Sequence, residues 1–135
     1  MRLKQAITLL FLVVMLAGCS PAPDKTVGKL SGEELKSRLD AGNAPLILDV
    51  RTPGEYAAGH IPGAVNIPHD ALGARLDELG VDRDAEIVVH CQSGRRAATA
   101  EELLMAEGYT SVQHLEGDMA GWRSAGLPVA ADAVP

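Results

Sequence analysis

The chain has 135 residues, of which 47% are hydrophobic, 22% are charged and only 3% are aromatic. This length and composition indicate one globular domain with an aliphatic core, and they exclude a disordered chain or a coiled coil. The formal net charge of −6 argues against a general attraction to nucleic acid or to anionic lipid, so any anion must be bound locally. The two cysteines, Cys19 and Cys91, form no CxxC motif, and no metal site is expected.

The first residues have the pattern of a secretory signal. Arg2 and Lys4 precede a continuous apolar run over 6–17, which is too short for an ordinary membrane-spanning helix. The run ends in "LAGC", residues 16–19, which resembles the lipobox of bacterial lipoproteins. The resemblance implies removal of residues 1–18 and lipidation of Cys19, where several acyl chains give stable anchoring.

Residues 19–30 hold two prolines and little apolar material, which is typical of a tether between an anchor and a domain. Ser20, rather than an acidic residue, favours the outer over the inner membrane under the sorting rule of enteric bacteria. The expected location is therefore the bacterial cell envelope, with the domain in the periplasm. If Cys19 carries lipid, Cys91 is left without a disulfide partner, and it is either buried and inert or retained for chemistry.

Capping patterns and short apolar runs predict the elements of the first half of the domain. Ser31 with Glu34, and Thr52 with Glu55, each match a capping box at the start of a helix. The runs between these helices are of the kind found in buried parallel strands. The sequence thus predicts, in order, a helix over 32–41, a strand over 45–50, a short helix over 53–58 and a brief strand over 64–67.

The second half continues the alternation. The expected elements are a longer helix between Pro68 and Gly80, a strand over 85–90, a helix over 95–107, a strand over 111–117, and a last helix capped by Asp118 with Trp122 as a core anchor. Strands alternating with helices indicate an α/β fold, a parallel sheet with helices on both faces. We expect one domain over 31–129 and a frayed tail over 130–135.

Cys91 stands at the carboxyl end of its predicted strand, which is the edge where ligands bind in such sheets. The loop "CQSGRR" contains Gly94, which can adopt backbone conformations that other residues avoid. Successive N–H groups of this loop and the following helix N-terminus are expected to form an anion cradle around Cys91. These dipoles, together with Arg95 and Arg96, favour the nucleophilic thiolate.

The loop Cys91-Gln92-Ser93-Gly94-Arg95-Arg96 resembles the C-x-x-G-x-R active loop of rhodaneses, the single-cysteine sulfurtransferases. Upstream, "DVRTPGEYAAGHIPGAVNIP", residues 49–68, is similar to the first signature of that family. "GWRSAGLPV", residues 121–129, is similar to its usual carboxyl end. The resemblance extends over about residues 30–129.

This resemblance implies a rhodanese fold with a five-stranded parallel sheet, and a two-step reaction that needs no cofactor. The Cys91 thiolate takes the outer sulfur of an anionic donor such as thiosulfate, and the resulting persulfide passes it to cyanide or a thiol. Small sulfur-containing anions are therefore the expected donors. Cyanide, small thiols and partner proteins are the expected acceptors.

The resemblance also assigns the charged residues of the site. Arg96 fills the loop-closing arginine position, with a role in anion binding and loop order, while Gln92, Ser93 and Gly94 supply the cradle. Arg51 is a second candidate for donor binding, with a salt bridge to Glu55 as the alternative. Arg95 either contacts substrate or points to solvent.

Neighbouring polar residues are expected to be structural. Asp49 is interpreted as a carboxylate that bonds backbone near the loop, and His60 as a hydrogen-bonding residue of its turn. His90 precedes Cys91 in a strand, so its side chain should point to the opposite face and is not expected to act as the base.

Two other functions fit the loop. Cysteine phosphatases also place a cysteine before a glycine-containing arginine loop, but with five residues between cysteine and arginine; here that position is Ala97. The shorter loop favours a single sulfur over a phosphate. A non-enzymatic module, with Cys91 as a redox sensor or a docking element, is the alternative from a different class.

Overall fold

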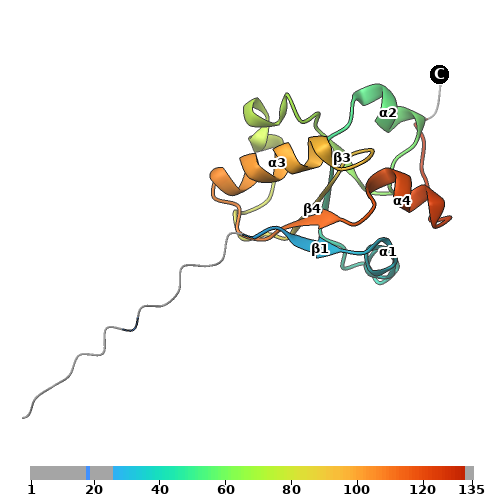
Figure 1. Ribbon diagram of the computed structural model, residues 1–135, viewed down its shortest axis with the longest axis horizontal. Coiled ribbons are helices and arrows are strands. Elements are labelled where there is room, and N and C mark those ends of the chain that lie inside the picture. The colour runs from blue at the N-terminus through green and yellow to red at the C-terminus, as the bar shows by residue number, and fades with distance from the viewer. Residues whose placement is uncertain (1–17, 19–25, 133–135) are drawn as a thin grey trace, which may run out of the picture.

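The computed structural model describes residue 18 and residues 26–132, and it forms one five-stranded sheet between two layers of helices (Figure 1). The strands are β1 (Gly28–Leu30), β2 (Leu46–Asp49), β3 (Val65–Asn66), β4 (Ile87–His90) and β5 (Val112–Leu115). They lie in the order β1-β5-β4-β2-β3, and every neighbouring pair is parallel. The predicted five-stranded parallel α/β fold is confirmed.

Three α-helices connect strands, namely α1 (Gly32–Asp40), α2 (Pro53–Ala58) and α3 (Arg95–Ala106), and α4 (Asp118–Ser124) follows β5. The N-terminal caps predicted at Ser31 and Thr52 are present. Ser31 Oγ accepts a hydrogen bond from the Glu34 N–H, and Thr52 and Glu55 form a complete capping box at α2. Within residues 18 and 26–132, no helix is long and apolar enough to cross a membrane.

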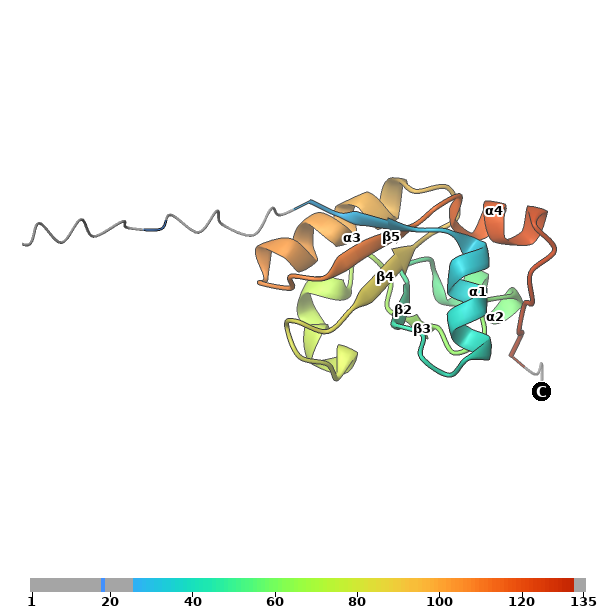
Figure 2. The ribbon, with the colours of Figure 1, turned by 90° about the horizontal axis from the view of Figure 1, so that it is seen from below.

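Alternating residues of the central strands divide the core into two clusters. Ile87 and Val89 of β4 face α3 and the short turns before β4, whereas Val88 faces α1 and α4. Figure 2 shows these two layers on opposite faces of the sheet. Trp122 is 1% exposed in the second cluster, and its indole N–H donates to the Pro128 carbonyl at 2.8 Å, which confirms it as a core anchor.

The structure corrects the predicted tether at its carboxyl end. Residues 28–30 belong to β1, which pairs in parallel with β5, rather than to a linker. Three residues are too few to show a strand periodicity, and only the neighbouring strand β5 selects the extended conformation. The other residues assigned to the signal and tether lie outside the described part of the chain, except for residue 18 and residues 26–27.

The predicted long helix between Pro68 and Gly80 is wrong. The segment forms two 3₁₀ turns, Leu72–Ala74 and Leu76–Leu79, separated by Arg75 with φ −123° and ψ 19°. Gly73 weakens helix propensity here, while Leu72 and Leu79 still reach the core. The apolar spacing of this segment therefore indicates which residues are buried, but it does not indicate a continuous helix.

The tail is ordered further than predicted. Ala130 forms a two-bond antiparallel bridge with His60, at N···O distances of 2.8 and 2.9 Å, and the Asp132 N–H donates to the Ala57 carbonyl. The prediction of fraying is thus wrong for residues 130–132. This bridge ties the chain end to the loop after α2.

Candidate active site

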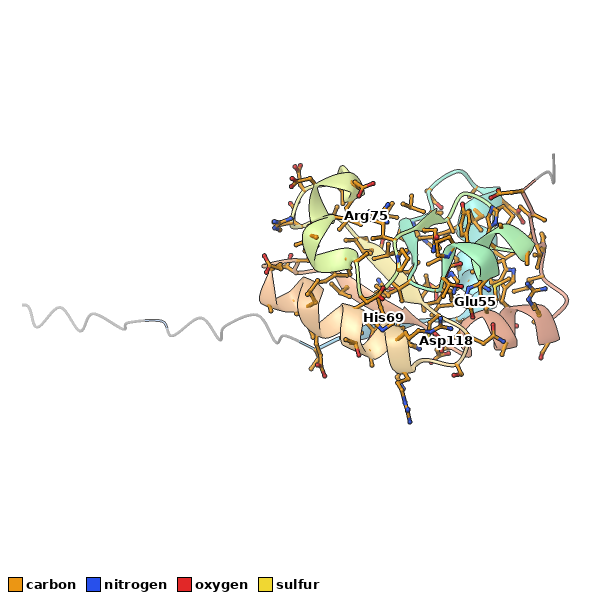
Figure 3. All side chains as sticks on the ribbon, turned by 90° about the horizontal axis from the view of Figure 1, so that it is seen from above. Glu55, His69, Arg75 and Asp118 are labelled. Atoms are coloured by element: carbon orange, nitrogen blue, oxygen red, sulfur yellow. The ribbon has the colours of Figure 1, made fainter. Side chains whose placement is uncertain are left out.

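The carboxyl ends of the parallel strands meet at one edge of the sheet, and the cysteine loop lies there. β4 ends at His90, Cys91 follows at once, and α3 begins at Arg95. Figure 3 labels Glu55 of α2 and Asp118 of α4, which contact this loop from two other elements through the bonds given below. The first turns of α2 and α4 are therefore both linked to the segment that joins Cys91 to α3.

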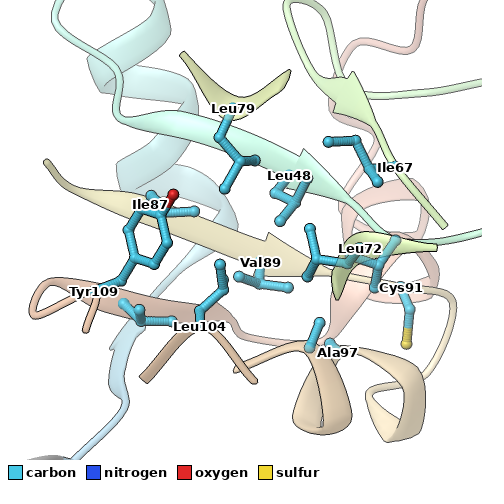
Figure 4. Close-up of a cluster of buried hydrophobic side chains, with 13 residues drawn as sticks. Leu48, Ile67, Leu72, Leu79, Ile87, Val89, Cys91, Ala97, Leu104 and Tyr109 are labelled. Atoms are coloured by element: carbon cyan, nitrogen blue, oxygen red, sulfur yellow. The ribbon is translucent and has the colours of Figure 1, made fainter. Parts of the chain in front are cut away.

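Cys91 is 1% exposed and closes one end of the apolar cluster that packs under α3 (Figure 4). Its Sγ accepts a hydrogen bond from the Gly94 N–H at 3.0 Å. Gly94 makes this bond possible with φ +110°, a conformation that side chains disfavour. The predicted turn thus folds back on the sulfur.

The loop is held through its carbonyl groups, and four of its N–H groups have no protein acceptor within the described residues. The first turn of α4 donates to the loop, from Met119 N to the Cys91 carbonyl at 3.0 Å and from Ala120 N to the Gln92 carbonyl at 3.2 Å. Within residues 26–132, no protein acceptor takes the N–H of Gln92, Ser93, Arg95 or Arg96. Such an array of free donors at a helix start is suited to an anion.

Arg96 is held beside the loop by Glu55. Its two terminal nitrogens donate to the two carboxylate oxygens at 2.7 and 3.0 Å, which joins α3 to α2. The Glu55 hydrogen bond chiefly raises the pKa of Arg96, and the Cys91 side chain adds to this rise. Arg96 in turn lowers the pKa of Glu55 to about 2. A paired, bidentate arginine fits the predicted role in loop order.

Arg51 does not form the salt bridge to Glu55 considered from the sequence. It is 2% exposed, and its guanidinium bonds the Asp49 carboxylate, with a shortest distance of 2.7 Å, and the Gly59 carbonyl at 2.7 Å. In this arrangement the guanidinium supports the β2–α2 connection and offers little surface to a donor. Arg95, by contrast, is exposed, and nothing within the described chain holds its side chain.

Asp49 and His90 are both buried, and neither reaches the Cys91 sulfur by a hydrogen bond. Asp49 bonds the backbone N–H of Arg51 at 3.0 Å, so its predicted structural role is confirmed at β2 rather than at the cysteine loop. His90 Nδ1 lies 3.2 Å from the Cys91 carbonyl oxygen, and Nε2 lies 3.8 Å from Asp49. Burial lowers the pKa of His90, which Asp49 opposes only in part.

His60 has the structural role predicted for it. Its Nδ1 lies 2.8 Å from the Tyr56 carbonyl oxygen, and its ring stacks on Tyr56 with centroids 3.8 Å apart.

Three ionisable residues of the site were not predicted from the sequence. Asp118 does not cap α4, whose N-cap is Gly117; instead it has φ +54°, and its Oδ1 accepts the Cys91 N–H at 2.9 Å. Its Oδ2 lies 3.0 Å from His114 Nε2, and His114 Nδ1 lies 2.5 Å from Glu101 of α3. A series of hydrogen bonds therefore runs from the Cys91 N–H through Asp118 and His114 to Glu101.

Only some of these hydrogen-bonded residues could be recognised from the sequence. The i, i+4 spacing of His114 and Asp118 is visible but spans a strand end and a turn, where no periodicity applies. Glu101 sits among the helical positions of α3 and looks like a surface residue. Cys19, the predicted lipidation site, lies outside the described residues.

Comparisons with known proteins identify this arrangement. A family model of the rhodanese-like domain matches residues 31–125. A sulfurtransferase of Allochromatium vinosum is 38% identical over 105 residues, which cover 78% of this chain and 96% of that protein. An HTH-type transcriptional regulator of Mycobacterium tuberculosis, Rv0324, is 44% identical over 97 residues, covering 71% of this chain and 42% of the regulator.

Solved structures give the same result. The Anabaena protein Alr3790 superposes with a TM-score of 0.70 at 33% identity, over 76% of this chain and 82% of that one. A thiosulfate sulfurtransferase of Pseudomonas aeruginosa superposes with a TM-score of 0.69 at 30% identity, over 80% of this chain and 21% of that one. The chain thus belongs to the rhodanese-like domain family, and its function is of the sulfurtransferase type.

Proposed function

We propose that the protein moves a sulfane sulfur from thiosulfate or a similar anion, through a persulfide on Cys91, to cyanide or a thiol. The observation that carries this proposal is the contact of the Cys91 Sγ with the Gly94 N–H, in a loop where the N–H groups of Gln92, Ser93, Arg95 and Arg96 have no acceptor among residues 26–132. These donors suit a sulfur that carries negative charge. The Allochromatium and Pseudomonas relatives support the same class of chemistry.

The first step needs no external oxidant or reductant. The Cys91 thiolate attacks the outer sulfur of thiosulfate, a new S–S bond forms, and the original S–S bond breaks with its electron pair leaving as sulfite. The enzyme is left with a terminal persulfide anion. The Gly94 N–H already donates to the Cys91 sulfur, and such a preorganised donor stabilises negative charge without reorganisation.

The second step returns the thiolate. The cyanide carbon, or an acceptor thiolate, attacks the terminal sulfur, and the Cys91 S–S bond breaks with its electron pair remaining on Cys91. Thiocyanate or an acceptor persulfide leaves. Arg96, fixed by Glu55, supplies positive charge beside the loop in both steps.

The loop size supports sulfur over phosphate. The residue at the arginine position of a phosphatase loop is Ala97, which is fully buried in the core and carries no charge. No guanidinium is therefore available at that position to close the loop around a phosphate.

A redox-sensing or docking module is a second candidate. Its support is the similarity to a transcriptional regulator, of which this chain covers only 42%. In that case Cys91 would be oxidised or bound without turnover, and catalytic transfer to cyanide would not occur.

We also propose that Cys19 carries lipid and anchors the domain to the envelope, on the basis of the "LAGC" sequence at residues 16–19. Metabolic labelling of the native chain with a radioactive fatty acid tests this proposal. Label in the native chain and its loss in Cys19→Ser support the anchor, and an unlabelled native chain contradicts it.

The test of the enzymatic proposal is turnover. The native protein, supplied with thiosulfate and cyanide, should release thiocyanate catalytically; Cys91→Ser should release none. Cys19→Ser is the matched control, because it removes the other cysteine and should turn over at the native rate. Equal activity of Cys91→Ser and the native protein would overturn the persulfide mechanism, and turnover by neither would favour the sensing module.

A further inference from the structure

The underside of the cysteine loop rests on two carboxylates joined by one histidine. Asp118 of α4 accepts the Cys91 N–H at 2.9 Å, His114 of β5 lies 3.0 Å from Asp118, and Glu101 of α3 lies 2.5 Å from His114. We call these three residues, Glu101, His114 and Asp118, the carboxylate–histidine network. Asp118 and Glu101 are buried, at 3% and 6% exposed, while His114 is partly open to solvent.

The geometry fixes the protonation of the histidine. Both ring nitrogens face carboxylate oxygens, which accept hydrogen bonds and cannot donate them when ionised. Both nitrogens therefore donate, and the ring is an imidazolium. In agreement, hydrogen bonds to Asp118 and Glu101 raise the pKa of His114 to about 10. Among residues 26–132, no cluster of His, Cys, Asp or Glu is arranged to hold a metal ion, so the network is a hydrogen-bonded one.

The network lies directly under the turn that holds the sulfur. A Cβ built on Gly94 would meet the Asp118 Oδ2 at 3.1 Å and His114 Nε2 at 3.8 Å, and the Gly94 N–H is the group that donates to the Cys91 Sγ. The Asp118 carboxylate thus contacts the backbone of Cys91, the residue that carries the reacting sulfur. A negative charge there, if uncompensated, disfavours a thiolate and a persulfide anion.

We propose that His114 is a positioning residue for the Cys91 loop: it orients the Asp118 carboxylate toward the Cys91 N–H and compensates its charge beside the sulfur. This inference rests on the proposed function for its purpose, because a sulfur carrier must hold a negative charge on Cys91. The effect of His114 on the ionisation of the Cys91 thiol, however, can be measured without any sulfur donor.

Other charged groups surround Cys91 and stay in place in the test. Arg96 of α3 faces it and is paired with Glu55 of α2, while His90 of β4 lies behind it with Asp49 of β2 and Arg51, which follows β2. None of these contacts the carboxylate–histidine network by a hydrogen bond within the described residues. A substitution at His114 therefore changes the charge next to Asp118 and Glu101, and of these two carboxylates only Asp118 bonds the Cys91 loop.

The experiment is the pH dependence of Cys91 alkylation by iodoacetamide, read from the mass of the Cys91 peptide so that Cys19 does not contribute. In His114→Gln, the midpoint of the profile should rise by about one pH unit, which slows alkylation about tenfold well below the midpoint. Lys36→Gln is the matched control, because it removes a cation from another i, i+4 carboxylate pair, on α1, and should leave the midpoint unchanged.

A double variant separates compensation from simple structural support. In His114→Gln/Asp118→Asn, the amide oxygen can still accept the Cys91 N–H, and the carboxylate next to Cys91 is no longer charged. Glu101 keeps its charge but does not contact the Cys91 loop by a hydrogen bond, so the midpoint should return toward the native value. A lower melting temperature of His114→Gln with an unchanged midpoint would overturn the inference, as would a double variant that keeps the raised midpoint. If the midpoints move as expected while thiosulfate loads no sulfur, the proposed function fails and the inference stands.

Discussion

Arg96 and Glu55 join the start of α3 to the start of α2 through two parallel hydrogen bonds, 41 residues apart in the sequence. The same Glu55 carboxylate also accepts the Thr52 N–H and hydroxyl, both at 2.9 Å, and so completes the capping box of α2. One side chain therefore both starts a helix and orients the arginine beside Cys91. The two motifs of the sequence, at residues 49–68 and 91–96, are physically a single unit.

This relationship predicts a change in both stability and donor binding for Glu55→Gln. The variant should lose about 1 kcal/mol of unfolding free energy, because a partly exposed ion pair and a cap contact are weakened. The KM for thiosulfate should rise severalfold because Arg96 is no longer fixed. Denaturant unfolding and initial rates measure the two effects.

The matched control is Glu78→Gln, which breaks an exposed pair with Arg75 away from the loop. It should leave the KM unchanged. An equal KM effect in both variants would contradict the role assigned to Glu55.

The pKa of Glu55 is about 2 in the folded protein and near 4.5 when unfolded. The contribution of Glu55 to the unfolding free energy is therefore present above about pH 4.5 and disappears as the pH falls toward 2.

Gly94→Ala should damage both the loop and the reaction. The residue has φ +110°, and a new Cβ would lie 3.1 Å from the Asp118 carboxylate, so we expect a loss of about 1–3 kcal/mol and a large fall in sulfur transfer. Gly42→Ala is the control, since Gly42 also has a positive φ, +73°, but open space around its Cβ position. It should lose stability through strain alone and keep its rate per folded molecule.

Arg51→Met tests whether Arg51 supports the fold or binds the donor. Removing the guanidinium leaves the Asp49 carboxylate buried without its partner, so unfolding free energy should fall by about 3–5 kcal/mol. Under conditions where the variant remains folded, the KM for thiosulfate should be native. A raised KM without a loss of stability would instead identify Arg51 as a donor-binding residue.

The stability of the protein should also depend on pH through His114. Its pKa is about 10 in the folded protein and near 6.5 in an unfolded chain, so the folded state holds the proton more tightly. This contribution, on the order of 2 kcal/mol after screening, is complete below about pH 6.5 and is lost as the pH rises through 10. The difference in unfolding free energy between native protein and His114→Gln should shrink over that range, and a constant difference would contradict it.

The strand–helix order and the position of Cys91 could be predicted from the sequence because they depend on local signals. The N-caps at Ser31 and Thr52, and the turn after a buried strand, are set by neighbouring residues. The fold of residues 72–79 could not, because Leu72 and Leu79 reach the core equally well from 3₁₀ turns and from a helix. Apolar spacing does not distinguish these alternatives.

The charged partners of the site could not be predicted for a different reason. Arg96 with Glu55, and His114 with Glu101, are long-range pairs that exist only once α2, α3 and β5 meet at one edge of the sheet. Asp118 was expected to cap α4 because of its position at the start of that helix. Its positive φ instead turns the carboxylate toward Cys91. Tertiary packing, and not propensity, selects these contacts.

If Cys91 carries the sulfur, incubation with thiosulfate must change the intact mass of the protein. We expect a gain of one sulfur, about 32 Da, in the native protein and in Cys19→Ser, but none in Cys91→Ser, and we expect cyanide to remove it. A native protein that gains no sulfur from thiosulfate or polysulfide, or a Cys91→Ser variant that still gains it, would show that Cys91 is not the sulfur carrier.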